Sequence, residues 1–240
     1  MNPPPLSDDE LFPENESGAI VDHDFAQSLV RQRIQRTLVI TETAFLASTA
    51  ALIWLINFYF PVGPLLRIFF PIPIALVYLR WHRRAAWMAA IVSALLLSVL
   101  MGPPRSLQYL IPHGIMGVVF GGCWRKQQSW GVSIFWGGIL GTVGFFFQVA
   151  LISLLLGENL WIYFNQQVTS FIDWALVQLN ILLVLDLWMV QGVALLLVLM
   201  QSTVYALIVH IVAWMLLDRL GNPIPDPPPW LQAILEEPAD

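Results

Sequence analysis

Long apolar runs separated by short polar or proline-containing gaps occupy most of the chain, from about Thr37 to Leu217. A helix that crosses a bilayer needs about 20 apolar residues. The runs therefore predict an all-α fold, a polytopic membrane helix bundle with six transmembrane helices at about 37–60, 65–79, 85–101, 107–122, 130–156 and 186–217. Because proline disrupts a helix interior, we expect the second helix to kink or to be partly unwound at Pro71 and Pro73, and the fourth to be interrupted at Pro112.

The segment 160–185 departs from this pattern, because polar residues interleave there with Trp and Phe. Amphipathic helices and aromatic side chains favour the membrane–water interface, so we expect this segment to lie along the outer surface. The alternative divides 174–217 into two spans around Gln191 and Gly192. That alternative gives seven spans and places the carboxyl end outside, which the basic residues argue against.

Basic residues fall in alternate gaps between the apolar runs. One set of gaps, with the flanks of the first and last runs, holds Arg31, Arg33, Arg36, Arg80, Arg83, Arg84, Arg125, Lys126 and Arg219. The intervening gaps hold only Arg105. Because cytoplasmic loops carry an excess of Lys and Arg, we expect both termini in the cytoplasm. The expected organisation is a disordered acidic tail (1–36), a membrane domain (37–220) and a Pro-rich tail (221–240).

Composition agrees with a membrane protein. Apolar residues make up 58% of the chain and charged residues 11%, whereas a soluble domain carries about 25% charged residues. Many carboxylates lie in the first 24 residues or after residue 217, where they are typical of solvated, disordered tails. We expect the protein in the plasma membrane, or in the thylakoid membrane of a cyanobacterium. The single cysteine, Cys123, excludes an internal disulfide.

Four ionisable residues are candidates for substrate binding: Arg67, Arg105, His113 and Asp173. Ionisable side chains within spans are expensive and often functional. Arg67 either extends to the headgroups or contacts an anionic substrate group. His113 either faces a ligand or is a buried imidazole bonded to a carbonyl that the proline has freed. Arg105 and Asp173 belong to the polar outer face, where a small-molecule pocket is expected.

Other residues predict contacts between helices. We expect Glu42 to pair with Arg36, Arg83 or Arg84, and Gln148 and His210 to form interhelical hydrogen bonds. Small residues spaced by four let helices approach closely. In the first span they are Ala44, Ala47, Ser48 and Ala51, which serve either to dock a partner helix or to pack the bundle internally.

Several chemistries lack their motifs in this sequence. It contains no Gly-x-x-x-x-Gly-Lys-Ser/Thr phosphate loop, no His-Glu-x-x-His zinc helix and no Gly-x-Ser-x-Gly elbow. We therefore expect no enzymatic activity, no cofactor or metal, and no nucleic-acid partner.

Three stretches carry a resemblance to a known family: Pro71 to Arg80, Gly102-Pro103, and Pro112 to Gly121. They resemble the YybS-like family of multi-spanning bacterial membrane proteins, a domain of unknown function. That family is in turn similar to the substrate-binding (S) components of energy-coupling-factor transporters. The resemblance implies six helices, cytoplasmic ends and a pocket near the outer face. It also implies that Ala-x-x-x-Ala on the first helix meets a transmembrane coupling subunit driven by cytoplasmic ATPases.

The resulting hypothesis is a substrate-binding subunit of a small-molecule uptake system, whose ligand the sequence does not identify. The alternative is a non-transporting scaffold or assembly factor of a membrane complex, which would recruit partners through its acidic tails.

Overall fold

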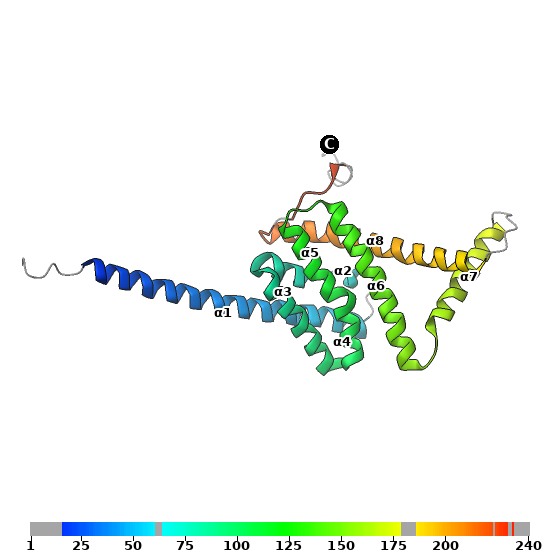
Figure 1. Cartoon of the computed structure of the whole chain (residues 1–240), viewed down its shortest axis with the longest axis horizontal. Helices are drawn as coiled ribbons and strands as arrows, with labels where there is room; N and C mark the ends of the chain where they lie inside the picture. The colour runs from blue at the N-terminus through cyan, green and yellow to red at the C-terminus, as the bar shows by residue number, and fades with distance from the viewer. Residues whose placement is uncertain (1–15, 61–63, 179–185, 223, 230–231, 233–240) are drawn as a thin grey trace, which may run out of the picture. The chain divides into compact units, whose positions relative to one another are not determined.

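The computed structural model describes residues 16–60, 64–178, 186–222, 224–229 and 232. Within these residues all regular elements are helices, which confirms the all-α class (Figure 1). They are α1 (Glu16–Tyr59), α2 (Pro64–Ile68), α3 (Ile72–Met101), α4 (Pro103–Tyr109), the π-helical turn η2 (Leu110–Gly114), α5 (Ile115–Arg125), α6 (Trp130–Leu156), α7 (Leu160–Gln178) and α8 (Leu187–Arg219).

Four stretches of the described residues are long and apolar enough to cross a membrane: Leu29–Tyr59, Leu65–Met101, Trp130–Leu156 and Leu187–Arg219. The expected second and third spans fall together in one of these stretches, and the expected fourth span is divided among α4, η2 and α5. The six-span count therefore stays a prediction.

Residues 1–41 and 42–240 form two separate units, and α1 is divided between them. In the first unit residues 16–41 are helical, although a disordered tail was expected up to residue 36. Much of this segment consists of Ala, Leu, Gln and Arg, which favour helix. The preceding residues, 1–15, lie outside the described part of the chain.

The prolines of the expected second span occupy the start of a helix. Pro71 is the N-cap residue of α3 and Pro73 lies in its first turn, so neither interrupts a hydrogen-bond ladder. Proline is favoured there because the first N–H groups of a helix have no intrahelical partner. The second span is therefore interrupted beside these prolines, as expected, but the interruption is a turn between two helices and not a kink within one. The short α2 precedes a turn at Phe69 and Phe70, and a helix starts afresh after it.

The first part of α3 runs antiparallel to α1. Arg80 pairs with Glu42 near the start of the second unit. At the other end Trp54 contacts Phe70, with ring centroids 4.8 Å apart. The segment 70–80 therefore lies alongside α1 and runs in the opposite direction.

The chain then reverses at His82, where φ is +70° and ψ is 178°. Beyond it, the Ser93 hydroxyl donates to the Ala47 carbonyl at 2.9 Å. The guanidinium carbon of Arg105 lies 4.5 Å from the ring centroid of Phe58. Residues 93–105 therefore run parallel to α1. The reversal occurs in the basic gap that the sequence places between two apolar runs.

α5 packs tightly on the first part of α3. A Cβ at Gly117 would lie 2.6 Å from the Pro71 carbonyl oxygen, and one at Gly121 would lie 2.4 Å from the Tyr78 Cβ. Only glycine permits this approach. Before α5 the helical path breaks at Ile111 (φ −116°, ψ 107°), beside Pro112, where an interruption was expected.

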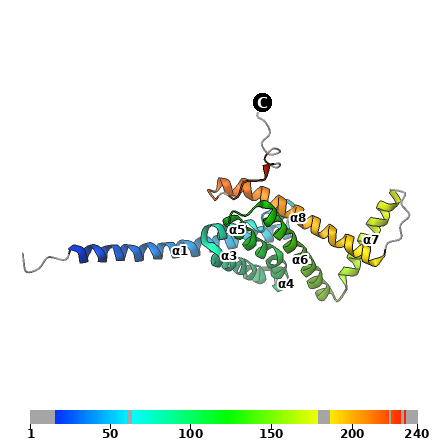
Figure 2. The same cartoon turned by 45° about the horizontal axis from the view of Figure 1, so that its top comes forward.

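α6 and α8 lie side by side and antiparallel (Figures 1 and 2). Gly137 of α6 faces Ala206, and Gly141 faces Ser202. At the end where α6 begins, the Trp130 indole donates to the Pro225 carbonyl at 2.8 Å. Part of the expected carboxyl-terminal tail, residues 224–225, thus docks on the bundle.

α7 packs beside α6 and α8. The ring of Phe164 lies 5.1 Å from that of Phe145 in α6. Val168 is buried with Val190 and Ala194 of α8. The amphipathic segment is thus helical over 160–178, and its expected continuation, 179–185, lies outside the described residues.

Large apolar side chains cover much of the outside of the second unit. Val99 is 85% exposed, Leu154 81% and Trp188 82%. Helices with apolar outer faces are stable where lipid tails cover them. The chain is therefore a helical membrane protein whose outer faces contact the bilayer.

Candidate functional site

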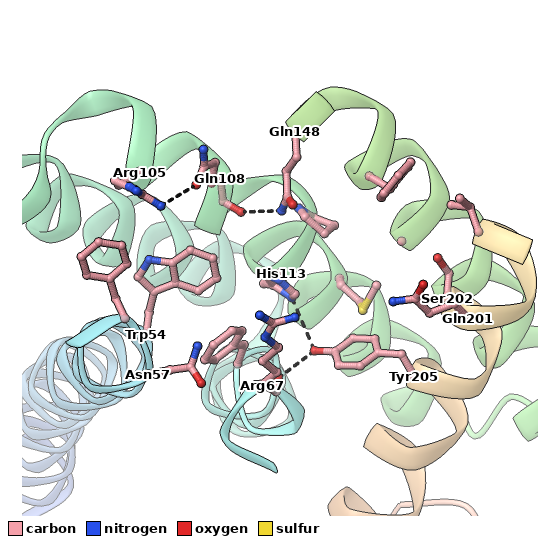
Figure 3. Close-up of a pocket in the computed structure, with 17 residues that line it drawn as sticks. Trp54, Asn57, Arg67, Arg105, Gln108, His113, Gln148, Gln201, Ser202 and Tyr205 are labelled. Atoms are coloured by element: carbon pink, nitrogen blue, oxygen red, sulfur yellow. Dashed lines mark hydrogen bonds between the residues drawn. The ribbon is translucent and has the colours of Figure 1, made fainter. Parts of the chain in front are cut away.

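A cavity of about 470 Å³ opens at one end of the second unit (Figure 3). This volume lies within the range of small-molecule sites, roughly 300–1,000 Å³. Its wall comes from the carboxyl-terminal part of α1, from α2, from the turn before α3, from α4, η2 and the start of α5, and from the facing parts of α6 and α8. The lining residues are Trp54, Asn57, Phe58, Arg67, Phe70, Arg105, Gln108, Pro112, His113, Met116, Gly141, Phe145, Gln148, Val198, Gln201, Ser202 and Tyr205.

The cavity and the basic gaps lie at opposite ends of the helices. Trp54 and Phe58 of the cavity are three and four turns along α1 from Glu42, which pairs with Arg80. Likewise α6 runs from Trp130, next to the basic Arg125–Lys126 gap, to Gln148 in the cavity wall. The ends of the bundle are thus chemically distinct.

One wall of the cavity is a continuous row of rings. Trp54 contacts both Phe70 (4.8 Å between centroids) and His113 (5.5 Å). His113 in turn contacts Phe70 at 5.0 Å and Tyr205 at 6.0 Å. The planes of these rings are inclined to one another by 51–76°, and such tilted and edge-to-face contacts hold the aromatic groups in a fixed arrangement.

Tyr205 connects α8 to the two irregular segments of the site. Its hydroxyl donates to the backbone carbonyl of Arg67 at 2.8 Å and lies 3.4 Å from Nδ1 of His113. The first bond fixes the end of α2. The Arg67 side chain extends from there toward His113 in Figure 3.

Arg105 lies on the opposite rim and is engaged by its neighbours. Its guanidinium stacks over Phe58, and one of its N–H groups donates to Oε1 of Gln108 at 3.5 Å. The backbone carbonyl of Gln108 accepts a hydrogen bond from the side-chain amide of Gln148 at 3.4 Å. This row of polar groups ties α4 to α6, and it confirms the predicted interhelical bond of Gln148.

The cavity carries positive charge without a counter-charge. Arg67 and Arg105 line it, and among the described residues no Asp or Glu does. The indole Nε1 of Trp54 is buried, and within the described part of the chain it has no hydrogen-bond acceptor. The guanidinium groups and the Trp54 indole therefore place N–H donors in the cavity, to which a ligand with acceptor atoms could bind.

The structure brings three of the four substrate-binding candidates together: Arg67, Arg105 and His113. Asp173 is exposed on α7 and does not line the cavity. Sequence reasoning missed Trp54, Asn57 and Tyr205, which face the same space. Asn57 offered a signal, because it is a polar residue near the end of an apolar run.

The small residues of α1 divide between two faces. Ala47 and Ala51 are buried, and the Ala47 carbonyl accepts the Ser93 hydroxyl. These two alanines pack inside the chain and are not available to a partner helix, which for them favours internal packing, the second of the two alternatives. Ala44 and Ser48 are exposed.

The predicted ion pair of Glu42 forms with a different arginine from those expected. Glu42 pairs with Arg80 and also accepts from the Trp81 indole at 2.7 Å, whereas Arg36, Arg83 or Arg84 was expected. Those two arginines follow the reversal at His82 and are exposed.

His210 is buried and contacts Ser133 of α6 at 2.8 Å, which confirms its interhelical role. Within the described residues no group of three His, Cys, Asp or Glu side chains is placed to hold a metal ion.

A family model described as a predicted membrane protein, DUF2232, matches residues 48–235. The chain belongs to this family. The DUF2232 match covers the helices that build the cavity, and it begins within α1. Comparisons with curated proteins and with solved structures gave no match. For this DUF2232 protein, the resemblance to YybS-like proteins and to S components rests on its sequence motifs alone.

Proposed function

We propose that this DUF2232 protein is the substrate-binding membrane subunit of a small-molecule uptake system, similar to an S component, and not an enzyme. The observation that carries the proposal is the cavity of about 470 Å³ at one end of the bundle. Its wall combines apolar and aromatic side chains with about as many polar or charged ones, and convergent polar groups beside an apolar surface can orient a bound molecule.

The proposed topology has six crossings with both ends in the cytoplasm. Glu42 near the start and Leu217 near the end of the second unit lie at the end that carries the basic gaps, which supports an even number of crossings. The reversal at His82 supports counting 65–79 and 85–101 as separate crossings. The positive-inside rule then orients the cavity toward the outside, where an uptake system meets its substrate.

A partner helix would approach the exposed small residues of α1. Ala44 and Ser48 are spaced by four and lie on one exposed face. The proposed partner is a transmembrane coupling subunit with cytoplasmic ATPases.

The first experiment is purification in mild detergent with a carboxyl-terminal tag, followed by mass spectrometry of bound proteins and small molecules. A coupling subunit with ATPases is the expected result. An assembly of other membrane proteins, without ATPases or ligand, would contradict uptake and favour the scaffold.

Topology is tested separately by cysteine labelling in a Cys123→Ala background. A membrane-impermeant maleimide should label Glu158→Cys, at the exposed turn after α6, in intact cells. It should label Lys126→Cys only after permeabilisation. The reverse pattern would place the cavity on the cytoplasmic side and refute uptake from outside.

A further inference from the structure

The cavity carries positive charge that no described carboxylate in its wall neutralises, and such a charge is energetically costly within a membrane domain. Two guanidinium groups line it, and no carboxylate among the described residues does. The ion pair in the described residues, Arg80 with Glu42, lies at the other end of the helices. A charge at the membrane is stabilised by an opposite charge or by hydrogen bonds. An occupant with an anionic group would supply both.

The two arginines are not equivalent. Arg105 is held by stacking on Phe58 and by its bond to Gln108. Arg67 has its backbone fixed by the Tyr205 hydroxyl, while its side chain points into the cavity (Figure 3). An arginine on a fixed backbone can present its N–H groups to a carboxylate or phosphate in a paired geometry. Arg67 is therefore the group that meets the anion.

The other lining residues indicate the chemistry of the uncharged part of the ligand. Phe70, Trp54 and His113 form a row of rings inclined to one another by 51–76°, which can make edge-to-face and offset contacts with an aromatic ligand. The unpaired Nε1 of Trp54 requires an acceptor, since a buried donor without one costs about 1–3 kcal/mol.

From these observations we infer that the cavity binds an aromatic organic anion, whose carboxylate or phosphate contacts Arg67 and whose ring system packs against the row of rings that contains Trp54. This inference rests on the proposed function, because it names the ligand class of the same cavity. A lipid headgroup carries the same anionic chemistry, so the test separates the two sources.

The probes are 2-naphthoate and its neutral isostere 2-naphthamide, measured by isothermal titration calorimetry on the full chain in phosphatidylcholine nanodiscs. The wild type should bind naphthoate at least about tenfold more tightly than the amide, because hydrogen bonds to charged groups are the stronger ones. Arg67→Gln should bring the two affinities within about twofold of each other, and Arg67→Lys should keep part of the preference. Trp54→Phe should weaken naphthoate roughly fivefold.

The matched control is Arg84→Gln, which removes an exposed arginine at the opposite end and should change neither affinity. Equal binding of the two probes by the wild type, no binding of naphthoate, or an unchanged preference in Arg67→Gln would overturn the inference. If phosphatidylglycerol in the nanodisc abolishes naphthoate binding, a lipid headgroup occupies the site, which also overturns it. If calorimetry shows the anion preference but no coupling subunit co-purifies, only the proposed uptake function is refuted. If a coupling subunit co-purifies but calorimetry shows no anion preference, only the proposed ligand class is refuted.

Discussion

The tight contact between α5 and the first part of α3 gives a quantitative prediction. A Cβ on Gly121 would lie 2.4 Å from the Tyr78 Cβ and 2.9 Å from the Ala75 carbonyl oxygen, where ordinary contacts are 3.4–4 Å. Both atoms are part of the α3 backbone or attached directly to it, so a change of rotamer cannot move them away. Gly121→Ala therefore forces α5 and α3 apart.

Two opposing effects decide the size of the change. Overpacking costs about 1–3 kcal/mol, and alanine favours a helix over glycine by about 1 kcal/mol. Since whole helices must move, we expect a cost at the upper end and a net loss of about 2 kcal/mol. By the scaling for chains of this size, that corresponds to a fall in unfolding temperature of roughly 4–8 °C.

The chain has its own reporter for the assay. Cys123 is its single cysteine and is buried, so a fluorogenic maleimide reacts with it when the bundle opens. Gly192→Ala is the matched control, because nothing lies within 4 Å of a Cβ at this position in α8. The control should unfold at the wild-type temperature or slightly above it. If Gly121→Ala and Gly192→Ala behave alike, the close approach does not stabilise the fold and the reasoning is refuted.

Three further experiments test other contacts, the first two with the same thermal assay and the third by proteolysis. Ser133→Ala leaves the buried Nε2 of His210 without its partner and should cost about 1–3 kcal/mol; an unchanged unfolding temperature would contradict this. A double-mutant cycle of Glu42→Gln and Arg80→Gln should give a coupling of about 0.5–1 kcal/mol, because both side chains are partly exposed; additive effects would show that the pair contributes nothing. Trp130→Phe removes the donor that holds the tail carbonyl, so limited proteolysis of the tail should become faster, and an unchanged rate would argue against docking.

The helices of the candidate site show which chain reversals and helix boundaries could be predicted from local sequence. The second part of α3, beyond His82, follows a basic gap that the sequence predicts as a turn, and the chain does reverse there. Pro71 and Pro73 were expected to break the second span, and the span is interrupted beside them, but both prolines belong to the start of the new helix. Proline is compatible with a first turn and incompatible with an interior, and sequence alone did not decide between these positions.

The small residues of α1 show the same limit. The spacing of Ala47 and Ala51 predicts a face that another helix can approach closely. Whether that helix belongs to the same chain depends on the tertiary fold, and here the second part of α3 takes the position through Ser93.

By itself, the sequence determined the class of the molecule, an all-helical membrane protein, because apolar runs of this length with so few charges are stable only as helices in lipid. It also determined which polar residues were worth attention, among them Arg67, Arg105 and His113. The tertiary structure decided which of these meet, excluding Asp173 and adding Trp54 and Tyr205. A cavity is made of segments distant in the chain, so which charges meet inside it, two arginines without a carboxylate among the described residues, is a property of the packed helices.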